Sequence, residues 1–194
     1  ASVVITRILV DSKDSAFRKP TKPIGPFYKS KVYPAMIKQL EGWRRVVASP
    51  EPKEIIDIQL IKDAMNKYVV IACGGGGIPV IRKRKTLHGI DAVIDKDFAS
   101  QVLATQLGAD QLIFITAVDN VYLDYGKKRQ SKLSAMDIAE AEKYLSEGHF
   151  GVGSMKPKIE ASIRFLESGG KKVVITSPKL LEKALKGKAG TVIE

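Results

Sequence analysis

The chain has 194 residues and a net charge of +11, and 44% of its residues are hydrophobic. This is enough apolar sequence for one sizeable domain core, and no apolar run reaches the length of a membrane span. We therefore expect a soluble protein without a membrane partner. The positive charge favours anionic partners such as nucleotides and phosphates. Nucleic acid is not expected, because no aromatic residue interrupts the densest basic run, 82–85.

Cysteine and histidine usage argues against two kinds of site. Cys73 is the only cysteine, so no internal disulfide can form, and a cytoplasmic location is expected. The two histidines, His88 and His149, are far apart and lack the spacing of metal ligands. We expect each of them in a loop or on the surface.

The N-terminal part of the chain alternates between apolar and proline-rich segments. Residues 2–10 (SVVITRILV) are rich in β-branched side chains and predict a buried strand. Residues 11–28 have no periodicity, and the prolines that flank Lys22 stiffen the backbone that presents it. The next elements are expected to be a short helix at 30–41, a strand at 42–47 and an amphipathic helix at 54–66.

Four consecutive glycines follow the next predicted strand, residues 68–73 (YVVIAC), which should be buried. Without Cβ atoms, Gly74, Gly75 and Gly76 would let the backbone approach a ligand and offer N–H groups to its oxygens. The spacing matches neither the dinucleotide fingerprint nor the P-loop. A tight turn is the alternative, but a loop after a strand end is where α/β folds bind ligands.

The middle of the chain predicts a hairpin, a helix and another strand. The hairpin covers 80–91, and Asp95 is expected to cap the helix that starts near Lys96 and stops at Gly108. Asp97 could form a surface salt bridge or orient catalytic lysines, and the residues alone favour neither.

A buried strand at 111–118 leads into a loop with two tyrosines, Tyr122 and Tyr125. They could hold a nucleobase or be ordinary packing aromatics. Ser134 and Asp137 form a near capping box for the following helix, which should reach Gly148.

A glycine-containing loop, residues 151–154, then enters a helix with Lys156 and Lys158 in its first turn. Ser154 is the expected N-cap, and Pro157 suits the opening turn. Lysine is unfavourable at the positive end of the helix dipole unless an anion binds there, and phosphate is the usual anion. Extension of both lysines into water is the alternative, and the residues alone favour it.

The C-terminal residues predict a strand at 172–176, a helix at 178–185 and a strand at 191–193. Strands and helices thus alternate along most of the chain. This alternation predicts an α/β fold with a mainly parallel central sheet covered on both faces, a three-layer αβα sandwich.

Several segments, taken together and in order, resemble the amino-acid kinase superfamily and, within it, the carbamate kinases. The resembling segments are 11–28 with its core Pro-Thr-Lys-Pro-Ile-Gly-Pro-Phe-Tyr, 42–50, 74–80, 92–97, 116–118 and 148–158. The resemblance implies one amino-acid kinase domain over 1–194, in which 11–48 include a protruding lid-like subdomain. It also implies a family N-terminal portion that this sequence lacks, so we expect residues 1–194 alone to be inactive or only partly folded.

The resemblance implies reversible phosphoryl transfer between ATP and carbamate, giving ADP and carbamoyl phosphate, with Mg²⁺. It further implies a cytoplasmic homodimer with a place in arginine metabolism. The alternatives are another superfamily kinase acting on a carboxylate or a nucleotide monophosphate, and a non-catalytic basic nucleotide-binding fragment.

The resemblance also assigns roles to residues of this sequence. The implied catalytic residues are Lys158, Lys96, Lys22, Asp97 and Asp95, with the lysines contacting phosphates and the aspartates holding the lysines. The implied substrate-binding residues are Gly74, Gly75 and Gly76. The implied nucleotide-binding residues are Ala117, Val118, Val121, Tyr122, Tyr125, Gly126, Lys127 and Met155. Metal ligands are not assigned, and Lys156 is expected to be a bystander.

Overall fold

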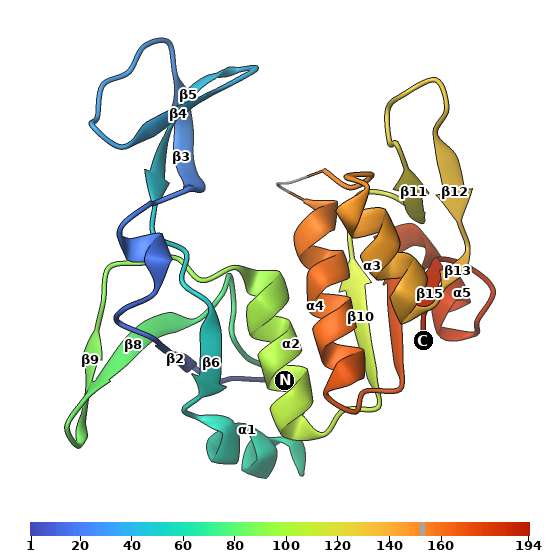
Figure 1. Cartoon of the computed structure of the whole chain (residues 1–194). Helices are drawn as coiled ribbons and strands as arrows, with labels where there is room; N and C mark the ends of the chain where they lie inside the picture. Colours follow the sequence, from blue (N-terminus) through green and yellow to red (C-terminus); the bar gives the residue numbers. More distant parts are fainter. Residues whose placement is uncertain (152–153) are drawn as a thin grey trace. The chain divides into compact units, whose positions relative to one another are not determined.

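The computed structural model describes residues 1–151 and 154–194 (Figure 1). They divide into two compact units, Ala1–Val102 and Leu103–Glu194. Helix α2 (Lys96–Leu107) begins in the first unit and ends in the second. Val152 and Gly153 of the predicted glycine loop lie outside the described residues. No helix in the described ranges is both long enough and apolar enough to cross a membrane.

The first unit is built on a four-stranded sheet. Its order is β6 (Pro52–Ile55), β2 (Arg7–Val10), β8 (Ile78–Lys83) and β9 (Thr86–Gly89). β2 is parallel to β8 and antiparallel to β6, and the hairpin of β8 and β9 was predicted. Ile8 pairs with Ile55, and both are fully buried. Helix α1 (Ile58–Met65) follows, shorter than predicted because 52–55 extend the sheet.

The predicted strand 2–10 divides into β1 and β2, of which β2 is buried as predicted, with Ile8 and Val10 0% and 3% exposed, whereas β1 and the strand predicted at 68–73 are short and largely exposed. β1 (Ser2–Val3) pairs in parallel with β7 (Val70–Ile71), and Val3 and Val69 are 72% and 78% exposed. The ladder ends at Val3 and Ile71, and beyond it Thr6 Oγ1 accepts a hydrogen bond from the Cys73 N–H and donates one to the Val4 carbonyl. Within the described residues β1 and β7 each have one neighbouring strand, so their apolar side chains are not covered.

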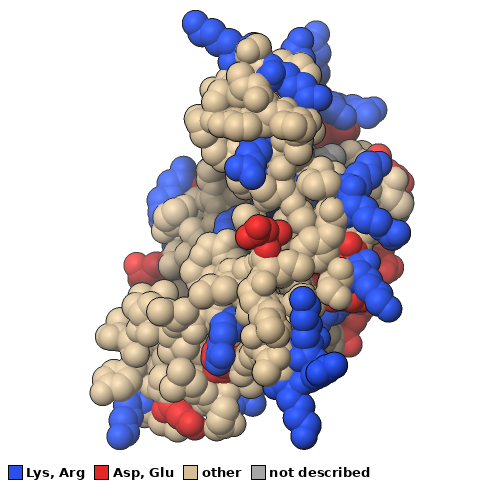
Figure 2. Space-filling model, turned by 90° about the vertical axis from the view of Figure 1, so that its left-hand side faces the viewer, with Lys and Arg blue, Asp and Glu red and all other residues tan. Residues whose placement is uncertain are grey.

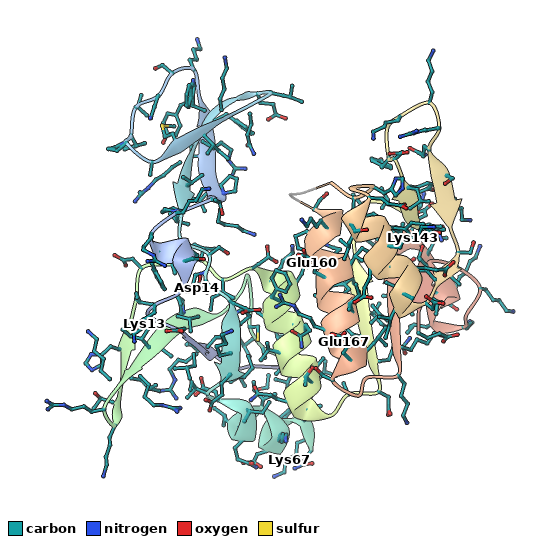
Figure 3. The ribbon with its side chains drawn as sticks, viewed as in Figure 1. Lys13, Asp14, Lys67, Lys143, Glu160 and Glu167 are labelled. Carbon is teal, nitrogen blue, oxygen red and sulfur yellow. The ribbon has the colours of Figure 1, made fainter. Side chains whose placement is uncertain are left out.

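A three-stranded antiparallel sheet forms a separate lobe of the first unit (Figure 1). Its order is β3 (Lys22–Tyr28), β5 (Gly42–Val47) and β4 (Met36–Gln39). The predicted helix at 30–41 is wrong, because 36–39 pair with 42–45 across a tight turn and Met36 is buried in the lobe. A short 3-10 helix, η1 (Ser15–Phe17), precedes the lobe and is capped by Asp14, which is labelled in Figure 3.

Basic side chains gather around this lobe, at the top of Figure 2. The Lys and Arg residues between positions 18 and 47 are Arg18, Lys19, Lys22, Lys29, Lys31, Lys38, Arg44 and Arg45, against one acidic residue, Glu41. The guanidinium carbon of Arg44 lies 5.1 Å from the centroid of the Phe27 ring, and that of Arg45 lies 5.9 Å from the Tyr33 ring. The positive charge is therefore more concentrated in space than the sequence indicated.

The second unit has a mixed four-stranded sheet. Its order is β10 (Gln111–Ile115), β14 (Lys172–Thr176), β15 (Thr191–Ile193) and β13 (Ala135–Met136). β10 and β14 are parallel, whereas β15 is antiparallel to β14. A hairpin, β11 (Val121–Leu123) with β12 (Ser131–Leu133), extends from the unit.

Helices supply the rest of the second unit. They are α3 (Ile138–Ser146), α4 (Met155–Glu167), the 3-10 helix η2 (Pro178–Leu180) and α5 (Leu181–Leu185). α4 packs on β10 and β14, and α5 packs on β14. Ile159 and Phe165 of α4, with Val173 and Ile175 of β14, are fully buried and form the core of this unit.

The cap of α3 differs from the prediction. Asp137, not Ser134, is the N-cap: its Oδ1 accepts from the Glu140 N–H at 2.8 Å, and Glu140 Oε2 accepts from the Asp137 N–H at 3.1 Å. Ser134 does not cap the helix, and its backbone carbonyl accepts a hydrogen bond from the Val192 N–H at 3.0 Å. The capping box therefore starts three residues later than the sequence suggested.

Replacing Asp137 with alanine should lower the free energy of unfolding by about 1 kcal/mol, because an orphan N–H of the first turn loses its acceptor. Ser134→Ala is the matched control and should change it by less than about 0.5 kcal/mol. Urea unfolding followed by circular dichroism measures both. Equal losses in the two variants would contradict the assignment of the cap.

Candidate functional site

The tetraglycine loop after β7 contains glycines of two kinds. A Cβ on Gly76 would lie 2.2 Å from the Ile94 carbonyl oxygen, and one on Gly77 would lie 2.6 Å from the Ile8 side chain. A Cβ on Gly74 or Gly75 would meet no atom within 4 Å. The second pair of glycines is thus required by packing, and the first pair leaves open backbone for a ligand. Packing therefore accounts for Gly76 and Gly77, and ligand binding by Gly74, Gly75 and Gly76 stays a prediction.

The ion pair between Lys22 and Asp95 joins two predicted catalytic residues that are far apart in the sequence. Asp95 also accepts a hydrogen bond from the Asp97 N–H at 2.9 Å and so caps α2, as predicted. Burial alone would raise the pKa of the Asp95 carboxyl, but the Lys22 ammonium and the Asp97 N–H outweigh it, and the pKa lies below its ordinary value. Lys22 therefore faces a carboxylate that stays ionised.

Asp97 and Lys96 lie side by side in the first turn of α2. Lys96 Nζ is 3.5 Å from Asp97 Oδ1, and the Asp97 side chain is buried whereas that of Lys96 is mostly exposed. Asp97 is therefore not the surface residue of an exposed salt bridge. A buried carboxylate at a helix N-terminus is favoured by the helix dipole.

The second unit contains a cavity of about 410 Å³. It lies between the segment after β10, the β11–β12 hairpin and the start of α4. The lining residues are Thr116, Ala117, Val118, Tyr122, Asp124, Tyr125, Lys127, Gly148, His149, Phe150, Gly151, Ser154 and Met155. Aromatic and aliphatic walls with a few polar groups are typical of small-molecule sites.

Six of the eight predicted nucleotide-binding residues line this cavity: Ala117, Val118, Tyr122, Tyr125, Lys127 and Met155. The other two do not. Val121 is fully buried, and its N–H donates to Thr191 Oγ1 at 2.8 Å, so it holds β11 in place. The Gly126 N–H donates to Gln130 Oε1 at 2.8 Å, which closes the tip of the hairpin.

The sequence did not single out Asp124, His149 or Phe150 as lining residues. His149 lies in a loop, as expected, but it also lines the cavity. Asp124 belongs to the turn Asp124-Tyr125-Gly126, whose tyrosine and glycine were predicted to bind the nucleotide, and this neighbourhood could have suggested Asp124 as well. For His149 the sequence held no signal, because the fold alone brings the end of α3 beside the β11–β12 hairpin.

Asp124 is the centre of a charged cluster on the cavity wall. Its Oδ1 lies 2.7 Å from Lys127 Nζ and 3.4 Å from His149 Nδ1, and its Oδ2 lies 2.7 Å from Arg129 Nε. His149 Nε2 also lies 3.0 Å from Glu147 Oε2. The hydrogen bond from Lys127, helped by His149 and Arg129, lowers the pKa of the Asp124 carboxyl from its ordinary 3.8 to about 2.

This lowered pKa makes a prediction about stability in acid. The contribution of ionised Asp124 is fully present above its ordinary pKa of 3.8 and is lost as the pH falls toward about 2. The stability of Asp124→Asn should therefore fall less than that of the unchanged protein as the pH drops from 3.8 to about 2. Thermal unfolding midpoints of both proteins through that interval provide the measurement, and parallel acid limbs would contradict it.

The two lysines in the first turn of α4 have different surroundings. Lys158 is buried, with 6% of its surface exposed. The Lys156 side chain is 43% exposed and lies 3.8 Å from Glu160, which Figure 3 labels on α4. Ser154 is the N-cap, as predicted, but makes no side-chain capping bond. Lys156 therefore extends into water, and Lys158 does not. Lys158 is not among the described residues that line the cavity.

The chain was compared with known protein families. The model of the Amino acid kinase family matches residues 8–177. The chain belongs to the amino acid kinase family. Its relatives include a carbamate kinase of Thermoplasma acidophilum, 52% identical over 98% of this chain and 65% of that protein. Carbamate kinase 2 of Staphylococcus aureus is 48% identical over 98% of this chain and 64% of that protein.

Solved structures agree with this family. The carbamate kinase of Giardia lamblia bound to AMP-PNP has a TM-score of 0.87 at 42% identity, over 98% of this chain and 64% of that chain. This likeness confirms the predicted α/β class and the three-layer amino acid kinase fold. The chain spans about 65% of the length of the curated relatives that it matches.

Proposed function

We propose that this amino acid kinase family chain acts in a carbamate kinase. The reaction is reversible phosphoryl transfer between ATP and carbamate, giving ADP and carbamoyl phosphate. The observation that supports it most is the 52% identity to the Thermoplasma acidophilum carbamate kinase, which extends over 98% of the chain.

The chemistry suits the side chains present. Phosphoryl transfer requires aligned reactants and neutralisation of charge on the moving group, with little covalent work by the protein. Lys158 is a buried lysine, 6% exposed, and a charge held away from water stabilises transferring charge more strongly than an exposed one does. Lys22 is held by Asp95 and Lys96 lies beside Asp97, so each has a carboxylate that fixes its position.

We assign the cavity of the second unit to ATP and ADP. Tyr122 and Tyr125, with ring centroids 5.8 Å apart, give apolar faces for an adenine base, and Met155 adds a polarizable thioether. A relative of known structure, from Giardia lamblia, binds the ATP analogue AMP-PNP. The open backbone at Gly74 and Gly75 is assigned to carbamate and the transferring phosphoryl group.

We propose that Mg²⁺ enters with the nucleotide. In the described part of the chain, no group of three or more His, Cys, Asp or Glu side chains could hold a metal ion. Mg²⁺ in such sites is bound largely by substrate phosphates and water, with one or two carboxylates at most. No residue is assigned as a ligand. The homodimer, the cytoplasmic location and a place in arginine metabolism stay predictions from the resemblance.

The chain spans 65% of the length of the Thermoplasma acidophilum carbamate kinase, so the test places it in the context of that whole enzyme. Substituting this chain for the matching segment of the Thermoplasma acidophilum carbamate kinase should preserve the activity. The assay supplies ADP, Mg²⁺ and carbamoyl phosphate and measures ATP. A folded chimera that binds ADP and forms no ATP would contradict the proposed function.

A further inference from the structure

One carboxylate stands inside the cavity of the second unit. Asp124 is the one acidic residue among the described lining residues, and its side chain is 6% exposed. The cations that face it, Lys127 and Arg129, are mostly exposed, so the negative charge lies deeper than the positive charges. Whatever part of a ligand reaches this wall therefore meets a fixed carboxylate.

The carboxylate retains capacity for a further hydrogen bond. Lys127, Arg129 and His149 contact its two oxygens, whereas an ionised carboxylate offers about four acceptor positions. The backbone of Asp124 has φ of 50°, in the left-handed region that side chains rarely adopt. These contacts hold both oxygens in place before a ligand arrives.

The charge of Asp124 also restricts how a nucleotide can lie. Phosphates would be repelled by the carboxylate, and they are favoured at the positive end of a helix. Ser154 and Met155, at the N-terminus of α4, line the same cavity and provide such an end. The group beside Asp124 must then be a neutral hydrogen-bond donor, and the ribose hydroxyls are the donors that suit a polar, charged corner.

We infer that Asp124 reads the sugar of the nucleotide, accepting a hydrogen bond from the 2′- or 3′-hydroxyl of ribose. This inference rests on the proposed function, because it takes ADP and ATP as the ligands of the cavity. Asp124 selects ribonucleotides over deoxyribonucleotides, and it sets the direction in which the phosphates leave the cavity.

The test compares dissociation constants of ADP, 2′-deoxy-ADP, 3′-deoxy-ADP and inosine diphosphate for the folded chimera described above, by calorimetry. One deoxy analogue should bind about 10- to 100-fold more weakly than ADP, the range expected for a hydrogen bond to a charged group. In Asp124→Asn this difference should fall to about threefold or less. Glu147→Gln is the matched control, because it makes the same acid-to-amide change at a carboxylate that contacts His149 but neither contacts Asp124 nor lines the cavity, and it should keep the difference.

The outcomes separate this inference from the proposed function. If the chain binds ADP without preferring it over either deoxy analogue, or if Asp124→Asn keeps the preference, the inference is wrong and the function stands. If Asp124→Asn instead loses a preference for ADP over inosine diphosphate, the carboxylate reads the base and the inference is again wrong. No binding of ADP would overturn both. Asp124→Gly, which accepts the same backbone angles, replaces the asparagine variant if that variant does not fold.

Discussion

Lys158→Ala should lower the rate of phosphoryl transfer by about 100- to 1,000-fold, while the dissociation constant of ADP rises much less. The reason is the burial of Lys158 in the first turn of α4, where little water screens its charge. A contact made mainly to the transferring phosphoryl group affects turnover and not ground-state binding. The measurement is kcat together with a separate ADP titration, in the chimera described above.

Lys156→Ala provides a matched control on the same helical turn. Lys156 is exposed and pairs weakly with Glu160, so its removal should change kcat by less than about threefold. Equal effects of the two substitutions would contradict the assignment of Lys158. A parallel loss of turnover and ADP affinity in Lys158→Ala would make it a nucleotide-binding residue instead.

Gly76→Ala should destabilise the first unit by about 3 kcal/mol or more. The added Cβ would lie 2.2 Å from the backbone oxygen of Ile94, and φ at this position is +140°, which side chains other than glycine rarely adopt. Ile94 immediately precedes Asp95, so relief of this clash would also displace the residue that holds Lys22. The result expected is early unfolding of the first unit, with loss of turnover.

Gly75→Ala distinguishes packing from ligand contact in the same loop. Its Cβ would meet no atom within 4 Å, so the stability should change by about 0.5 kcal/mol or less. Under the proposed function this variant should still lose affinity for carbamoyl phosphate, because the methyl group occupies open ligand space. Fluorescence of Trp43, the only tryptophan, reports unfolding of the first unit. Equal stability of Gly75→Ala and Gly76→Ala would contradict the conclusion that packing requires a glycine at 76 and not at 75.

Local patterns in the sequence predicted the elements whose stability is local. The apolar stripe of α4, the glycine that ends α2 and the hairpin of β8 and β9 are examples. The strand at 36–39 was predicted as helix because its conformation comes from pairing with β5, and the sequence does not display this register. The prediction of a buried strand holds for 7–10, which has a strand on each side, and fails for 2–3 and 70–71, because burial depends on neighbouring strands and not on apolar composition alone.

The candidate site was predictable to a similar extent. The residues themselves suggested a ligand loop at Gly74–Gly75 and an anion site at the start of α4, and the resemblance supplied the roles. The Lys22–Asp95 pair spans two distant segments, so only the fold reveals it. Asp124 was not singled out because nothing in its local sequence indicates that Lys127, Arg129 and His149 all contact its carboxylate. Lys158 is buried and Lys156 is exposed, and the local sequence does not show this difference because burial depends on the rest of the fold.

The initial rate of ATP formation by the chimera tests the central claim most directly. Carbamoyl phosphate and acetyl phosphate are supplied in parallel as phosphoryl donors to Mg²⁺-ADP. We predict rapid ATP formation with carbamoyl phosphate, far slower formation with acetyl phosphate, and loss of the first activity in Lys158→Ala but not in Lys156→Ala. A folded chimera that uses acetyl phosphate equally well, or that forms ATP at an unchanged rate without Lys158, would contradict it.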